Sequence, residues 1–263
     1  MLETDGDISG SGSSDPPFIS VSLDIGLYVL HDHASSFLAP GTMDWVEGPL
    51  VAEPMACAAR TSDTSFLAVG GHNRVSLRQF QAIPTDPTSV EGWLPASTWP
   101  DLETARFGLA CQVIGHKLLV SGSGATVEIV DIMTKAVSRG QELVTPRSYH
   151  QMFAFGEEGY MRLLALGGLH GVSFLPAVDW YEDEEGHWMK AWGRLRTPRS
   201  HSGGAAVSQE MVCSGQCGQE DCVEEQGGLC TVRMEGRVAK CWELFTPPSE
   251  AIQGVRLSKL LGR

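Results

Sequence analysis

Three segments of the chain carry the same landmarks in the same order, and this internal repeat constrains the fold more than any other feature. Each segment opens with a short motif that contains an arginine, at Arg106, Arg147 and Arg199. An apolar run, a turn and a second apolar run follow, and the second run stops at a pair of small residues: Ser121-Gly122, Gly167-Gly168 and Ser214-Gly215. From the arginine to the first small residue there are 15 positions in the first and third segments and 20 in the second. Such self-similarity predicts one supersecondary unit that is used several times.

Two weaker copies extend the series at either end. In one copy Met55 lies 15 positions before Gly70 and so occupies the position of the arginine. In the other copy, Thr246-Pro247-Pro248-Ser249, Pro248 occupies that position. The five anchor positions are therefore 51, 41, 52 and 49 residues apart. A tryptophan precedes most anchors by 6 to 10 residues, at Trp45, Trp99, Trp192 and Trp242. We interpret the extra length of the copy that opens at Arg147 as an insertion in the turn around residues 156–160.

The segments between these landmarks have the length and composition of β-strands. Short apolar runs bounded by Gly, Pro, Asp and Ser recur from Phe18 onward, and no window carries a convincing helical period before residue 251. Strands are expected at residues 19–23, 27–30, 66–69, 109–114, 118–120, 127–132, 162–166 and 205–207. The 30 glycines and 14 prolines suit a fold of many short strands joined by many turns. The sequence therefore predicts an all-β fold.

Composition divides the chain into three parts. Residues 1–17 are rich in Gly and Ser and end at Pro16-Pro17, which predicts a disordered polar tail. Residues 18–250 form the body that carries the repeats. For the C-terminal segment, residues 251–263, two structures stay open: a short helix, or a strand that closes the first unit.

The repeat resembles that of the kelch family, and the likeness is most specific in residues 145–192. There Pro146-Arg147 leads to Leu163-Leu164-Ala165-Leu166-Gly167-Gly168, then to Val178-Asp179-Trp180-Tyr181, and finally to Trp188 and Trp192. The resemblance implies a kelch-type β-propeller of about five four-stranded blades, incomplete or unconventionally closed, in which each blade buries its apolar faces against its neighbours. In such a unit we expect tight turns at the small pairs, hydrogen bonds from the arginine between blades, and a tryptophan packed between sheets with its N–H on a backbone acceptor.

The same resemblance implies that the chain binds another protein, as a substrate-recognition adaptor or a related interaction module, and is not an enzyme. Function in a repeat ring is expected in the loops at one mouth, because these can vary while the sheets stay fixed. The candidate partner-binding residues follow the small pairs or lie near the Pro-Arg anchor: His72, Asn73, Arg74, Tyr149, His150 and His170. For each of them the alternative is an ordinary polar loop residue.

Two other interpretations of the function stay open. A propeller enzyme that acts on sugars or small molecules would need acidic, arginine or histidine side chains that meet at one mouth. A truncated or decayed kelch protein would account for Met55 and Pro248 in place of the anchor arginine. Cooperative thermal unfolding of a monomer would argue against decay.

Charge and hydropathy narrow the choice of partners. The net charge of −13 would repel a phosphate backbone, so we expect no nucleic-acid partner. No apolar stretch approaches the roughly 18 residues of a membrane helix, and the acidic start of the chain is unlike a secretory signal. We therefore expect a cytoplasmic protein that does not bind membranes.

The seven cysteines are an odd number in a chain too large to need disulfide staples, so we expect reduced thiols. Five of them lie near the C-terminus: Cys213, Cys217, Cys222, Cys230 and Cys241. Their spacing lacks the paired Cys-x2-Cys knuckles of structural zinc sites. Zinc ligation and a disulfide stay open there beside ordinary thiols, and we predict neither a metal nor another cofactor.

Overall fold

The computed structural model describes residues 19–31, 34–48, 50, 55–70, 75–81, 92–157, 160–182, 186–195, 197–207, 210–217, 229–235 and 238–244. Beyond Ser200, and at a few positions within earlier strands, it describes the backbone only. The predictions for residues 1–17 and 251–263 lie outside these stretches. The described chain is all-β, with a short 3-10 turn, η2 (Ala96–Thr98), and no α-helix. None of its helical turns is long or apolar enough to cross a membrane.

The N-terminal half of the described chain forms three antiparallel sheets. The first sheet has the order β1-β2-β3-β4 and the second the order β5-β6-β7, and the third has the order β11-β10-β9-β8. The bounds are β1 (Ile19–Leu23), β2 (Gly26–His31), β3 (Ala34–Leu38), β4 (Trp45–Glu47), β5 (Met55–Ser62), β6 (Ser65–Gly70), β7 (Leu77–Gln81), β8 (Ala110–Ile114), β9 (Lys117–Ser121), β10 (Val127–Asp131) and β11 (Val137–Arg139).

The remaining strands form one eight-stranded sheet and a small hairpin. The eight-stranded sheet joins two antiparallel groups, the fourth unit β12-β13-β16-β17 and the fifth unit β18-β19-β20-β21, through one parallel pair, Trp192 opposite Val238. The bounds are β12 (Gln151–Glu157), β13 (Tyr160–Leu166), β14 (Leu169–His170), β15 (Ser173–Phe174), β16 (Ala177–Glu182), β17 (His187–Arg194), β18 (Arg199–Val207), β19 (Glu210–Cys217), β20 (Leu229–Glu235) and β21 (Val238–Leu244). Among the described strands, no sheet closes on itself.

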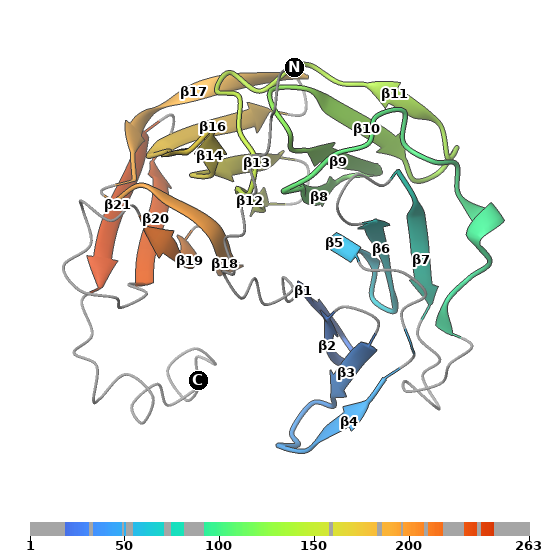
Figure 1. Ribbon diagram of the computed structural model, residues 1–263. Helices are drawn as coiled ribbons and strands as arrows, with labels where there is room; N and C mark the ends of the chain where they lie inside the picture. The colour runs from blue at the N-terminus through green and yellow to red at the C-terminus, as the bar shows by residue number, and fades with distance from the viewer. Residues whose placement is uncertain are drawn as a thin grey trace, which may run out of the picture.

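The three segments that open with arginine are equivalent units. Arg106, Arg147 and Arg199 each open an antiparallel group of four strands, in which the first strand pairs with the second and the second with the third. Residues 19–47, which carry no anchor motif, also form a complete four-stranded sheet, whereas the second unit has three strands among the described residues. The sheets follow one another in chain order along an arc, with β1, β5, β8, β12 and β18 on its inner side (Figure 1).

The apolar core lies between successive sheets because the second strand of a unit is buried on both faces. In β9, Leu118 and Val120 pack toward the second sheet, and Leu119 packs toward the fourth unit. The strands β6 and β13 alternate in the same way between two clusters. Side chains of adjacent strand residues point to opposite faces, so a strand buried on both sides reads as a continuous apolar run. This is why residues 66–69, 118–120 and 162–166 could be recognised as strands.

The extra length of the fourth unit is paired structure and not a looped-out insertion. The β12–β13 ladder runs from Gln151 opposite Leu166 to Glu157 opposite Tyr160, seven pairs in all. The corresponding β8–β9 ladder has five pairs. The predicted insertion around residues 156–160 is therefore a longer hairpin, and its base keeps the register of the shorter one.

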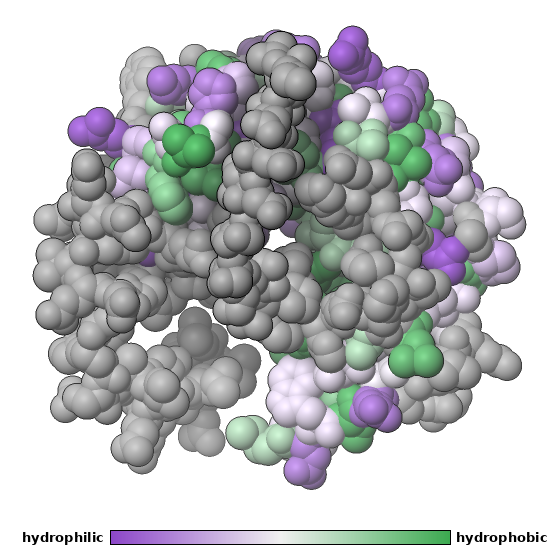
Figure 2. Space-filling model, viewed as in Figure 1, coloured by the Kyte–Doolittle hydropathy of each residue, from purple (hydrophilic) through white to green (hydrophobic). Residues whose placement is uncertain are grey.

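Two landmark tryptophans have described side chains, and they behave differently. Trp99 is 7% exposed, lies in the cluster between the second and third sheets, and donates its N–H to Gln79 Oε1 at 2.9 Å. Trp45 is 51% exposed on β4, the outer strand of the first sheet. The predicted packing is confirmed for Trp99, although its acceptor is a side-chain amide, and is wrong for Trp45. Figure 2 shows pale and apolar residues at the lower edge of the molecule, where Figure 1 places β4.

The expectation that the cysteines are reduced is wrong for one pair. Cys57 of β5 and Cys111 of β8 are joined by a disulfide, with 5.9 Å between their Cα atoms. The two residues are 54 positions apart in the sequence. Only the packing of one sheet on the next brings them together, so no motif could reveal the pair.

Candidate functional site

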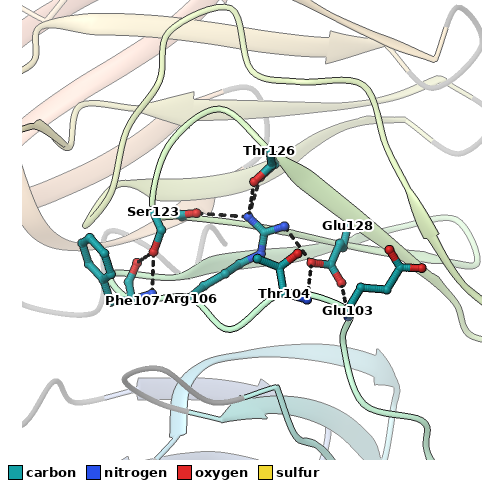
Figure 3. A network of polar contacts seen from close by, with 8 residues as sticks. Glu103, Thr104, Arg106, Phe107, Ser123, Thr126 and Glu128 are labelled. Atoms are coloured by element: carbon teal, nitrogen blue, oxygen red, sulfur yellow. Dashed lines mark hydrogen bonds and ion pairs between the residues drawn. The ribbon is translucent and has the colours of Figure 1, made fainter.

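The loops that carry the anchor arginines are held by buried polar networks. Arg106 is 1% exposed, and its Nη1 donates to Gly122 O at 3.1 Å, Thr126 O at 2.8 Å and Thr126 Oγ1 at 2.6 Å (Figure 3). Its Nη2 donates to Glu128 Oε1 at 2.7 Å. Glu128 in turn accepts the backbone N–H groups of Glu103 and Thr104. One planar guanidinium thus ties the loop before β8 to the ends of β9 and β10.

Arg147 repeats this arrangement in the fourth unit. Its Nε donates to Thr145 O, and its Nη1 donates to the carbonyls of Ala165, Gly167 and Ala177 at 3.1, 2.9 and 3.1 Å. Its Nη2 lies 2.9 Å from Asp179 Oδ2, an ion pair in which both side chains are fully buried. Burial lowers the pKa of Arg147, and the charge of Asp179 opposes that shift.

The arginine networks correct one detail of the kelch expectation. The acceptors are carbonyls and carboxylates, as expected, but they belong to the arginine's own unit and not to its neighbour. Each network therefore fixes a loop on its own sheet. Contacts between units are made instead by the apolar clusters, by a few hydrogen bonds, by the Arg60–Asp24 ion pair and by the Cys57–Cys111 disulfide.

Two aromatic side chains meet at the surface of these loops. Phe107 is 37% exposed, Tyr149 is half-buried, and their ring centroids are 6.1 Å apart. Ser123 Oγ accepts the backbone N–H of Phe107 at 2.7 Å and donates to the carbonyl of Phe107 at 3.1 Å. We call Phe107, Ser123 and Tyr149 the anchor-loop surface. Figure 3 shows Phe107 and Ser123 side by side at one end of the Arg106 network.

The backbone beneath the anchor-loop surface is tightly constrained. Tyr149 has a φ of +52°, and its N–H donates to Gly108 O at 2.8 Å across the boundary between the third and fourth units. Gly108 has a φ of +55°, and a Cβ there would lie 2.7 Å from Tyr149 N. A non-glycine residue in the left-handed region costs of the order of 1 kcal/mol and persists only where its surroundings determine it. The two loops therefore fix each other.

His150, a predicted partner-binding residue, lies beneath this surface and not on it. Its side chain is buried, and Nε2 is hydrogen-bonded to Ser121 Oγ at 2.8 Å. Its Nδ1 has no hydrogen-bond partner among the described residues. Burial, together with the charge of nearby Arg147, holds the pKa of His150 well below its usual range, so the imidazole is neutral at pH 7. The histidine supports the loop from inside.

The other predicted site residues fall in three places. Tyr149 belongs to the anchor-loop surface. His170 is exposed on β14, whose neighbour Leu169 exchanges two backbone hydrogen bonds with Ser148. His72, Asn73 and Arg74 lie outside the described residues. The structure therefore joins the loop of Tyr149 to the hairpin of His170 through Ser148.

Phe107 and Ser123 are the residues of this surface that sequence reasoning did not single out. Phe107 directly follows the anchor Arg106, and an aromatic side chain beside a buried anchor was a usable signal. Ser123 stands in Gly122-Ser123-Gly124, which was recognisable as a turn but gave no sign of which loop its hydroxyl would bind.

The described side chains contain one candidate pair for nucleophilic catalysis. Ser121 and His150 form a hydroxyl–imidazole pair, but both are buried, and no described carboxylate reaches Nδ1 of the histidine. A nucleophile–base pair also needs an orienting group and a path for substrate.

No three His, Cys, Asp or Glu residues gather to hold a metal ion where side chains are described. The side chains of Cys213, Cys217, Cys222, Cys230 and Cys241 lie outside that region, although the backbone register sets Cys213 opposite Cys230.

Comparison with known proteins adds no relative from which a role could be transferred to these residues. No protein-family model matches the chain, and a search of curated proteins finds no match.

Proposed function

We propose that the chain is a kelch-type, propeller-like interaction module that binds a protein partner through the anchor-loop surface. Three features support the kelch assignment. The units that open at Arg106, Arg147 and Arg199 are four-stranded and antiparallel, and the described arginines play the same buried role in two of them. Successive sheets also follow an arc in chain order (Figure 1).

The observation that carries the binding proposal is the aromatic pair Phe107–Tyr149. Aromatic side chains that are partly exposed and held on a rigid backbone offer a large contact area at a low cost in conformational entropy. Here Ser123 fixes Phe107, and the bond to Gly108 O fixes Tyr149. The surface is therefore preorganised for a partner.

The partner that fits this surface is a protein with apolar or aromatic side chains. The face offers two aromatic rings, one serine hydroxyl and backbone groups, and the chain's net charge of −13 disfavours a polyanion. An adaptor that presents one protein to another would use such a face. In keeping with the composition, we propose that it acts in the cytoplasm.

Substitution of Phe107 tests the proposal. Proteins captured by the tagged wild-type chain should be lost with Phe107→Ala, because the variant removes half of the aromatic pair. Capture should persist with Met133→Ala, which removes an equally apolar side chain that is 79% exposed elsewhere on the third unit. Quantitative mass spectrometry of the captured proteins, with thermal midpoints of all three chains, provides the measurement.

Retention of the same captured proteins by a folded Phe107→Ala chain would contradict the proposal. So would turnover of a sugar or small-molecule substrate that depends on Ser121 or His150, because that result would favour an enzyme.

A further inference from the structure

We propose that Cys57 and Cys111 form a redox-operated clamp that locks the second sheet to the third. The disulfide joins β5 to β8, the strands that lie on the inner side of the arc in their units (Figure 1). In a chain built from stacked sheets, each sheet contacts only its neighbours. A covalent bond across one junction therefore adds to the apolar contacts that the two neighbouring sheets share there.

No backbone hydrogen bond links the two strands that the clamp joins, among the described residues. The loops of the third and fourth units are held together by hydrogen bonds, from Tyr149 N to Gly108 O and in both directions between Gly124 and Arg147. Ser121 also reaches across that boundary to His150. Beside the second sheet, Leu102 N donates to Val75 O at 2.8 Å, but no backbone hydrogen bond between described residues runs from β5 to β8. Side-chain packing and the disulfide hold these two strands together.

The second unit, like the first, has no anchor arginine. Met55 stands where the other units have Arg106 and Arg147, and its side chain packs into the cluster between the first and second sheets. A methionine cannot make the four or five polar contacts of a guanidinium such as Arg106 or Arg147. Cys57 lies two positions after Met55, so the covalent bond is found beside the missing anchor.

The surroundings of the two sulfurs govern how the clamp opens and closes. Cys57 and Cys111 are 8% and 6% exposed and belong to one apolar cluster with Leu67 and Leu118. Exchange with an external thiol or disulfide requires access and a thiolate, so the junction must open locally before the sulfurs react. The bond thus forms and breaks only in molecules whose two sheets have separated.

The chemical step is thiol–disulfide exchange with glutathione. The thiolate of one cysteine attacks glutathione disulfide and releases one glutathione thiolate, which takes up a proton. The second cysteine then attacks the mixed disulfide, forms the Cys57–Cys111 bond and releases a second glutathione. Two cysteine thiols are oxidised and one glutathione disulfide is reduced. In a reducing cytoplasm the pair would be held as thiols, and a rise in glutathione disulfide would close the clamp.

A chain with only two thiols tests the clamp. The background carries serine at Cys213, Cys217, Cys222, Cys230 and Cys241, which leaves Cys57 and Cys111. Folded protein is equilibrated at graded ratios of glutathione to glutathione disulfide, quenched with acid, unfolded in urea with iodoacetamide, and its mass is measured. We expect two states, a doubly alkylated thiol form and an unalkylated disulfide form, whose proportions follow the glutathione ratio.

Urea unfolding of the two forms gives the second readout. Closing a loop of this length restricts the unfolded chain, so the unfolding equilibrium constant of the oxidised form should be lower on the order of 100-fold. Cys57→Ala in the same background is the matched control and should unfold identically at every glutathione ratio. If the five serines prevent folding, the wild-type chain serves instead, with the Cys57–Cys111 peptide identified by mass spectrometry and opening of β5 and β8 followed by hydrogen exchange.

Two results would overturn the clamp. One is a folded chain in which Cys57 and Cys111 remain thiols at a high proportion of glutathione disulfide. The other is oxidised and reduced forms that unfold at the same urea concentration.

Discussion

At the scale of single residues, the polar groups with the most demanding surroundings are Arg147 and His150. Both are buried, and the imidazole lies close enough to the guanidinium for that positive charge to lower its pKa. Asp179 compensates Arg147, but no described carboxylate reaches His150. A proton added to His150 would therefore create a second buried positive charge without a counterion.

This arrangement predicts acid sensitivity that originates at His150. Its folded-state pKa lies below the value of about 6.5 that it has in the unfolded chain, so the unfolded state binds more protons in acid. The resulting stability is fully present above about pH 6.5 and is lost as the pH falls toward the folded-state pKa. The loss should approach about 1.4 kcal/mol per pH unit over that window.

Urea unfolding at pH 7.5 and 5.5 measures the effect. His150→Gln keeps a polar partner for Ser121 but cannot titrate, so its free energy of unfolding should fall less between the two pH values than that of the wild type. Equal losses in both chains would show that His150 does not bind its proton more weakly when folded.

Sequence reasoning found the buried anchors at this scale but not what surrounds them. The arginines and small pairs recur in register, which marks them as parts of a repeated structure. The contact of Phe107 with Tyr149 and the disulfide between Cys57 and Cys111 both depend on how one unit packs against the next. Contacts between units leave no periodic trace in the sequence, so these features were visible only in the fold.

At the scale of elements, β4 shows where the repeat pattern misled. Trp45 has the spacing of a tryptophan packed between sheets, yet β4 is an edge strand of three residues, all of them exposed. Trp99 lies 7 positions before its anchor, where Trp45 lies 10 before, and it is packed. The difference arises because Trp99 has sheets on either side, whereas Trp45 belongs to the first sheet of the arc.

The two tryptophans predict opposite mutational outcomes. Trp99→Ala should destabilise the chain by about 3–5 kcal/mol, because it leaves a cavity and removes the donor to Gln79. Trp45→Ala should change the free energy of unfolding by no more than about 0.5 kcal/mol, as for most exposed positions. Urea unfolding followed by circular dichroism measures both, and similar losses would mean that Trp45 is covered in solution.

The clearest strand predictions fell on strands that are buried on both faces or whose burial alternates strictly. β1 coincides with the expected residues 19–23, and β6, β9 and β13 contain the apolar runs that predicted them. Short outer strands were not predictable. β4 and β11 have only three residues each, which is too few for a period to be read from the sequence.

At the scale of the whole molecule, the core is a series of shared layers. Because β6 and β9 each contribute to two clusters that neighbouring sheets share, none of the first three sheets has a core of its own among the described residues. Loss of one sheet would expose the apolar face of the next. The internal repeat predicted this arrangement, whereas the joining of the fourth and fifth units into one eight-stranded sheet could not have been predicted from it.

Shared layers predict that the described units unfold together. Leu119→Ala removes a fully buried side chain from the cluster between the third and fourth units and should cost about 2–5 kcal/mol. Tryptophan fluorescence and far-ultraviolet circular dichroism should still report a single coincident transition, shifted to lower urea. Separate transitions for the two signals would show that the units are independent and would favour a decayed repeat protein.

The β12–β13 hairpin illustrates how such a chain can change in length without losing its fold. Its two additional pairs lie at the end far from Arg147, next to the turn between Glu157 and Tyr160. Lengthening the hairpin at that tip moves none of the carbonyls that accept hydrogen bonds from the Arg147 guanidinium. The unit can therefore gain residues there while its base stays in place. The same tip is the natural place to splice in an epitope or a spectroscopic label while leaving the anchor-loop surface as it is.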